Sequence, residues 1–83
     1  MALRRLVRRL RYILHRQRVE SEILRLVGYD AQSQFLEVEF NTGDKYRYLD
    51  VPASEYEGLM SAESIGQYMH KHIIGHYDYD RII

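Results

Sequence analysis

Apolar and polar side chains alternate most clearly between residues 35 and 52, in two runs separated by a short polar loop. Leu36, Val38 and Phe40 alternate with glutamates, and Tyr46 and Tyr48 then alternate with basic residues. A period of two places successive side chains on opposite faces of a strand. Two such runs around an Asn/Gly/Asp segment predict a β-hairpin.

The loop 41–43 predicts the register of this hairpin. Three loop residues suit a type I turn followed by a residue at positive φ, where Gly43 carries no Cβ penalty. The pairs are then Phe40 with Asp44, Glu39 with Lys45, Val38 with Tyr46, Glu37 with Arg47 and Leu36 with Tyr48. One face is therefore apolar and carries both tyrosines. The other carries opposite-charge pairs, which we expect to be exposed and to contribute about 0.2–1 kcal/mol each.

Two further elements are predicted before the hairpin. Residues 2–18 predict an amphipathic helix, because apolar side chains recur at spacings of three and four, at Leu3, Leu6, Val7, Leu10, Ile13 and Leu14. Residues 23–29 are rich in strand formers, with Gly28 marking a bulge or a close contact. The polar turn 30–33 leads into the hairpin, which makes three antiparallel strands.

Helices are predicted after Pro52, which ends the third strand because it cannot donate to a ladder. Ser54 and Glu57 match a capping box and predict a short helix to about Met60. A second helix is expected from residues 61–63 onward, followed by an alternating segment at residues 77–82. The fold class is α+β: a three-stranded antiparallel meander covered by C-terminal helices and preceded by a basic amphipathic helix. We divide the chain into residues 1–19, the helix, and residues 20–83, the α+β domain.

Composition narrows the possible functions. The chain has 83 residues, 46% hydrophobic and 29% charged, which is typical of one small globular domain. It has no cysteine, which excludes disulfides, thiolate metal sites and a cysteine nucleophile. No apolar run is long enough to cross a bilayer, and a cytoplasmic location is expected.

Charge is distributed unevenly although the net charge is zero. Residues 1–18 hold seven arginines and no acid, whereas the remaining residues carry a charge of −7. Such asymmetry suggests an anionic partner for the basic end. Arginine-rich helices bind nucleic-acid phosphates with release of counterions. The candidate phosphate contacts in this helix are Arg4, Arg5, Arg8, Arg9, Arg11 and Arg16.

Two other interpretations of the same helix remain open. Its apolar stripe can pack on a protein partner, on a second copy or on its own domain, with the arginines solvated. A basic amphipathic helix can also lie on an anionic membrane, although this one has no Trp or Phe anchor.

Tyr46-Arg47-Tyr48 is a second candidate for nucleic acid, because aromatic side chains on a sheet can stack bases and Arg47 can hold phosphate. The register argues against stacking, since both tyrosines share the apolar face and are expected in the core. Arg47 remains a candidate phosphate contact.

Catalytic and metal sites are not predicted. His72 and His76 are spaced as in helical zinc sites, but a glutamate does not follow His72 and a closed site needs four ligands. No phosphate loop, nucleophile elbow or isolated carboxylate pair appears. We expect no catalytic residue, no metal and no cofactor.

The chain from about residue 20 to residue 80 resembles the KTSC domain, named for its occurrence at the C-terminus of some lysyl-tRNA synthetases. The matching features are Val27-Gly28-Tyr29-Asp30, Leu36-x-Val38-x-Phe40-x-x-Gly43, Tyr46-x-Tyr48, Asp50-Val51-Pro52, Ser64-x-Gly66-x-Tyr68, Ile73 and Tyr77. The resemblance implies a small α+β module for which RNA binding has been proposed. It supplies no catalytic residue and does not extend to the helix at 2–18.

Together these patterns lead to two hypotheses. The first is a non-enzymatic nucleic-acid-binding accessory module that prefers RNA to DNA. The alternative is a protein-interaction or oligomerisation module whose arginine-rich helix docks on a partner or a second copy. Binding of the same helix to a membrane surface is a third interpretation, which we rank below these two.

Overall fold

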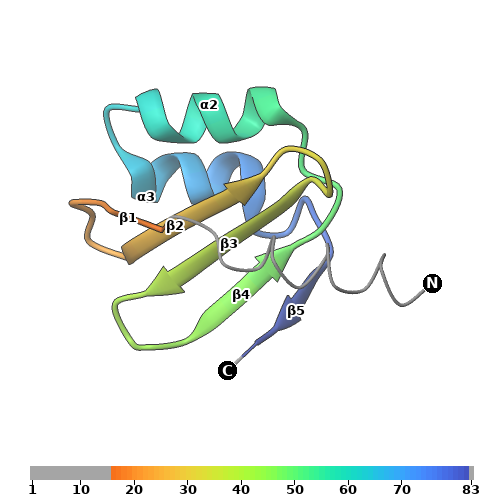
Figure 1. The fold of residues 1–83 in the computed structure, drawn as a ribbon. Coiled ribbons are helices and arrows are strands. Elements are labelled where there is room, and N and C mark those ends of the chain that lie inside the picture. Colours follow the sequence, from red (N-terminus) through yellow and green to blue (C-terminus); the bar gives the residue numbers. More distant parts are fainter. Residues whose placement is uncertain (1–15, 83) are drawn as a thin grey trace.

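The computed structural model describes residues 16–82, which form a five-stranded antiparallel sheet with helices on one face (Figure 1). The strands are β1 (Gln17–Arg18), β2 (Leu24–Asp30), β3 (Phe35–Phe40), β4 (Lys45–Tyr48) and β5 (Tyr79–Arg81). Their spatial order follows the chain, from β1 at one edge to β5 at the other. The predicted α+β class is confirmed, and the predicted meander corresponds to β2, β3 and β4.

The sheet has two strands more than predicted. β5 comes from the alternating C-terminal segment and pairs with β4, with Arg47 opposite Asp80. β1 pairs with β2 through Gln17 opposite Val27. Residues 17–18 were expected at the end of the N-terminal helix, so that end of the predicted helix is wrong. The rest of it, residues 2–15, lies outside the described residues.

The central hairpin has the predicted register, with Leu36 opposite Tyr48 and Glu37 opposite Arg47. The turn also forms as expected. Gly43 has a φ of 98°, its N–H donates to the carbonyl of Phe40, and the Phe40 N–H donates to the carbonyl of Asp44. Gly28 lies in a regular part of the ladder, opposite Glu37, and the irregularity in β2 falls between Leu24 and Leu26.

The helices are α2 (Ala53–Ser61), α3 (Ile65–Tyr68) and the π-helical turn η1 (Met69–Ile73). The predicted capping box does not form. The N-cap is Pro52, whose extended backbone leads directly into α2, and Ser54 falls inside the first turn. Ser64 caps α3 instead, its hydroxyl accepting from the N–H of Gln67.

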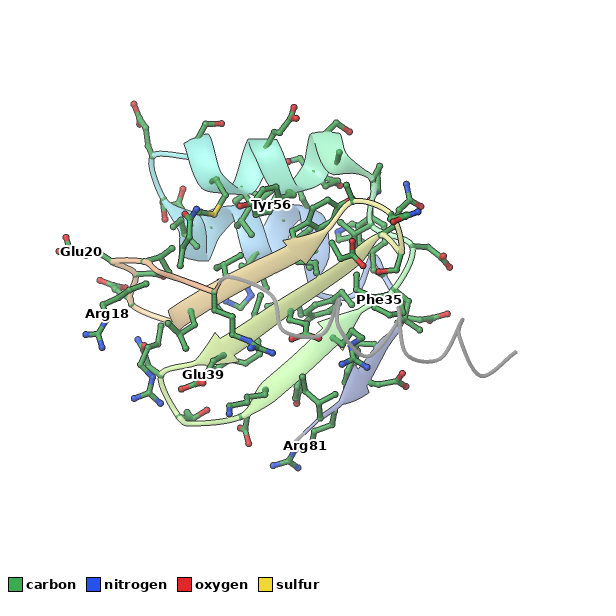
Figure 2. All side chains as sticks on the ribbon, viewed as in Figure 1. Arg18, Glu20, Phe35, Glu39, Tyr56 and Arg81 are labelled. Carbon is green, nitrogen blue, oxygen red and sulfur yellow. The ribbon has the colours of Figure 1, made fainter. Side chains whose placement is uncertain are left out.

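The core lies between these helices and one face of the sheet, which we call the inner face. Its buried side chains are Leu24, Val27, Leu36, Val38, Tyr48, Val51, Leu59, Met69 and Ile73. The opposite side, the outer face, carries Leu26, Gly28, Phe35, Glu37, Glu39, Lys45 and Arg47, because these positions alternate with the inner ones. In Figure 2, Tyr56 lies between α2 and the sheet, whereas Phe35 and Glu39 lie on β3 away from the helices.

Candidate functional site

The outer face is centred on a carboxylate held by two arginines. Glu37 in the middle of β3 is only 2% exposed. An Arg16 guanidinium nitrogen lies 2.5 Å from its Oε1, and Arg47 donates to Oε2 through Nε at 2.9 Å and a terminal nitrogen at 2.8 Å. Charge-assisted pairs of this kind are stronger than neutral hydrogen bonds. Both oxygens of the Glu37 carboxylate therefore have an arginine partner.

Cross-strand register explains why these groups meet. Gly28, Glu37 and Arg47 lie side by side on three adjacent strands. Continuing the β1–β2 register by one residue places Arg16 beside Gly28. Gly28 has no side chain, so the Arg16 side chain can pass over β2 and reach Glu37 on β3. The Arg47 guanidinium also lies 5.2 Å from the centre of the Phe35 ring, within the range of a cation–π contact.

The second glutamate on this face is in a different environment. Glu39 lies 2.6 Å from Arg25 and 3.7 Å from Lys45, and the side chains of both cations are more than two-fifths exposed. Opposite-charge pairing across the hairpin is thus confirmed for both glutamates. The expected exposure is wrong for Glu37, which two guanidinium groups contact, and Glu39 is also mostly covered, with 14% of its side chain exposed.

The two central tyrosines differ in exposure, although both lie on the inner face. Tyr48 is 2% exposed, and burial raises its pKa to about 12. Tyr46 is partly buried and stacks on Tyr79 with ring centres 4.5 Å apart. Tyr79 on the edge strand is 51% exposed. The prediction that the central tyrosines belong to the core is confirmed for Tyr48, which is excluded as a base-stacking platform.

A polar network that sequence reasoning missed joins α2 to the C-terminal elements. Both oxygens of Glu55 accept hydrogen bonds, from the hydroxyl of Tyr68 at 2.5 Å and from that of Tyr77 at 3.0 Å. The bond to Glu55 is the main cause that raises the pKa of Tyr68 to about 12, and burial followed by the same carboxylate raises the pKa of Tyr77. Because both carboxylate oxygens are occupied by chain hydroxyls, the network braces α2 against α3 and the segment before β5.

Gly58 permits this packing. A Cβ at position 58 would lie 2.2 Å from the hydroxyl of Tyr68, closer than real contacts allow. The motif Ser-x-Gly-x-Tyr drew attention to Tyr68, but its partner Glu55 appeared only as part of a short helix. Nothing in the sequence around Glu55 indicates that Tyr68 and Tyr77, which are 13 and 22 positions later, would bond to it.

The histidines do not form a metal site in this part of the chain. His72 in η1 stacks on Tyr68 at 4.3 Å. His76 follows Gly75, whose φ of 83° lies beyond the helix end, so the two histidines do not share a helical face. Within residues 16–82 no three His, Cys, Asp or Glu side chains converge to hold a metal ion. No helix in the same range is long and apolar enough to cross a bilayer.

A groove of about 800 Å³ lies between the connection from β1 to β2 and the start of α3. Its acidic side chains are Glu20, Glu22 and Glu63, and His70 and Lys71 also line it. It is lined in addition by Ile23 and Ile65. Sequence reasoning assigned no role to this region.

The predicted nucleic-acid contacts fall into two groups. Arg16 and Arg47 lie in the described structure, and both bind Glu37 on the outer face. Arg4, Arg5, Arg8, Arg9 and Arg11 lie outside the described residues. The structure therefore brings together two of the seven predicted residues, around Glu37, which the predicted register had paired with Arg47 but not with Arg16.

Comparison with known proteins identifies the fold. The model of the KTSC domain matches residues 20–77, and this range holds the central Tyr46-x-Tyr48 and most of the sheet and helices. The chain belongs to the KTSC family. The match also confirms the resemblance of residues 20–80, and it excludes the arginine-rich start of the chain, as expected.

Members of the KTSC family occur both alone and within larger enzymes. An uncharacterised protein of Stutzerimonas stutzeri is 40% identical over 70 residues, which cover 83% of this chain and 99% of that protein. A lysine–tRNA ligase of Trichormus variabilis is 36% identical over 63 residues, or 76% of this chain but only 11% of the ligase. The crystal structure of a KTSC domain protein from Yersinia pestis superposes with a TM-score of 0.82 at 33% identity, covering 84% of this chain and 99% of that one.

Proposed function

We propose that this protein is a non-enzymatic nucleic-acid-binding accessory module that prefers RNA. The observation that carries the proposal is the acid-free arginine segment, with seven arginines in residues 1–18. A segment of that charge binds polyanions because each neutralised phosphate releases counterions. A KTSC domain inside a lysine–tRNA ligase, an enzyme that joins lysine to tRNA, favours RNA as the polyanion.

Two carboxylates of the described residues are held by other side chains of the same chain. Glu55 has both oxygens bonded to tyrosine hydroxyls, and Glu37 has both bonded to arginines. Neither carboxylate is available as a general base while these bonds persist. A cytoplasmic location is part of the same proposal.

The structure also divides the candidate contacts. Arg47 and Arg16 share the single carboxylate of Glu37, so half of their combined charge is compensated within the chain. We assign the phosphate contacts mainly to Arg4, Arg5, Arg8, Arg9 and Arg11. Arg16 keeps an exposed side-chain fraction of 38% and can contact phosphate at the rim of the outer face.

Salt-dependent binding tests this function. Fluorescence anisotropy would be measured with a structured RNA and a DNA duplex of equal length, at about 50 and 200 mM salt, over which phosphate-binding proteins lose affinity strongly. Replacing Arg4, Arg5, Arg8 and Arg9 with alanine should lower affinity at least ~10-fold and reduce the salt slope by roughly 3. The control replaces Arg25 and Arg81, which pair with Glu39 and Asp44 on the folded domain. Absence of binding by the wild-type chain at low salt would overturn the proposal.

A second candidate function is self-association, which the groove beside α3 favours. Its three glutamates, Glu20, Glu22 and Glu63, complement an arginine-rich segment of another copy. Light scattering over a range of concentrations tests it. A monomer at every concentration, whether or not the arginines of residues 1–9 are replaced, removes this candidate.

A further inference from the structure

Within residues 16–82, the helices lie on one side of the sheet. α2 and α3 lie over the inner face, and η1 supplies Met69 and Ile73 to the core on that side (Figure 1). The outer face nevertheless has a buried centre, at Gly28 and Glu37. Leu26 and Phe35 on the same face are partly buried. A partly buried patch that contains Leu26, Gly28 and Phe35 therefore lies on the side of the sheet away from the helices.

The chain enters the described structure on this same face. Arg16 contacts Glu37 at 2.5 Å, and the β1–β2 register extended by one residue places Arg16 beside Gly28. β1 runs antiparallel to β2, with Gln17 opposite Val27 and Arg18 opposite Leu26. Arg16 therefore lies toward the end of the sheet where β2 finishes and β3 begins, which is the end that carries Phe35. Any segment joined to Arg16 has its point of attachment there.

The preceding segment matches this face in length and in pattern. An α-helix over residues 2–14 is about 20 Å long at 1.5 Å per residue. The sheet has five strands, which at about 4.8 Å spacing extend across roughly 19 Å. The segment has an apolar stripe of six side chains, and its five arginines fall on the opposite side of a helix.

We propose that residues 2–14 dock as a helix on the outer face of their own chain, anchored by the Arg16–Glu37 pair. The stripe from Leu3 to Leu14 covers Leu26 and Phe35, on either side of the Arg16 side chain that passes over Gly28. The segment holds five arginines and no acid, and a helix that lays its apolar stripe on the sheet keeps all five arginines away from the cations of this face. The docked helix displays its arginines to solvent as one basic surface; that this surface meets RNA rests on the proposed function.

Two matched pairs of substitutions test the docking in the full chain. Leu6→Asp with Leu10→Asp places two acids on the stripe, whereas Arg5→Asp with Arg9→Asp places two acids on the opposite side. Hydrogen exchange followed by mass spectrometry reports the protection of residues 1–15. We expect slow exchange in the wild type, at least a ten-fold acceleration in the leucine pair, and retained protection in the arginine pair.

A second measurement locates the surface. In the leucine pair, amide chemical shifts should change at Leu26, Phe35 and Glu37, and change little at Leu59 under α2. Glu37→Gln should also accelerate exchange in residues 1–15, whereas Glu39→Gln, whose cations belong to the hairpin and β2, should not. Wild-type exchange as fast as in a free peptide, or equal acceleration by both pairs, would overturn the proposal.

The remaining outcomes separate this inference from the proposed function. Protection that grows with protein concentration shows a second copy as the occupant and overturns docking within the chain. Protection that appears only when RNA is added overturns it as well. A protected segment in a chain that binds no RNA supports the docking and contradicts the proposed function, and RNA binding without protection does the reverse.

Discussion

The two faces of the sheet follow the same alternation but reach burial by different means. On the inner face, apolar side chains such as Leu36 and Tyr48 are buried because helices cover them. On the outer face, Glu37 is equally buried because Arg16 and Arg47 surround its carboxylate. Periodicity identifies which residues share a face. It does not predict whether a charged residue is exposed to solvent, because that depends on whether side chains from other strands contact it.

Removing the buried ring at the centre of the inner face should have the largest effect. Tyr48→Ala should lower the free energy of unfolding by about 3–5 kcal/mol, the cost of emptying a large aromatic from a core. Urea unfolding measures it, with Tyr79→Ala as the control, because Tyr79 is 51% exposed. We expect the control to cost about 1 kcal/mol or less. Equal losses in the two variants would mean that Tyr48 does not anchor the core.

Breaking the clamp on the outer face should rank second. Arg47→Ala removes the Nε and terminal-nitrogen contacts to Glu37 and leaves a buried oxygen without them. The expected loss is roughly 1–3 kcal/mol, because a buried acceptor loses its partner.

The matched control for Arg47→Ala is Arg25→Ala, whose partner Glu39 also pairs with Lys45 near the surface. It should cost about 1 kcal/mol at most, because Arg25 itself is 46% exposed and Glu39 keeps Lys45 as a partner. If both arginines cost the same, the burial of Glu37 has no energetic consequence. The two faces would then differ in apolar packing alone.

Obstructing the path of Arg16 should have a smaller effect. Gly28→Ala places a methyl group on the outer face between Arg16 and Glu37. Alanine in place of glycine within a strand ordinarily favours folding, since glycine weakens strands. Here we expect a loss of roughly 1 kcal/mol from overpacking. A thermal melt measures the sign of the change in stability. A gain would show that the Arg16 side chain does not need the space left by the missing side chain at Gly28.

Much of the fold could be predicted because it depends on local pattern. The register of β3 with β4 followed from alternation and from a loop that needed Gly43 at positive φ. α2 was also expected, but its capping box was not formed because Pro52 begins the helix directly. β1 could not be predicted, since two residues carry no period and pair only because β2 offers an edge.

The sites were harder to predict than the fold, because they join residues distant in sequence. Glu37 meets Arg16 over 21 positions, and Glu55 meets Tyr77 over 22. Neither carboxylate belongs to a local motif. Arg47 was singled out for its aromatic neighbours, yet its partner was the glutamate directly opposite, which the predicted register already contained. That register gave the only sequence signal for the clamp.

The smallest expected effect is a loss of stability at alkaline pH, which belongs to the inner side alone. Burial raises the pKa of Tyr48 to about 12, and the bond to Glu55 raises that of Tyr68 to about 12, above the ordinary value of 10. A pKa raised in the folded state favours the protonated fold. Its contribution is complete below pH 10 and is lost as the pH rises through the interval from 10 to 12.

Urea unfolding at pH 8, 10 and 11 measures this loss. Tyr48→Phe and Tyr68→Phe should each flatten the decline, because phenylalanine has no proton to lose. Tyr68→Phe should also lower stability at pH 8, since Glu55 then keeps only the bond from Tyr77. Arg47→Ala should lower stability by a similar amount at all three values and leave the slope unchanged. A decline as steep as in the wild type in both phenylalanine variants would show that neither Tyr48 nor Tyr68 causes it.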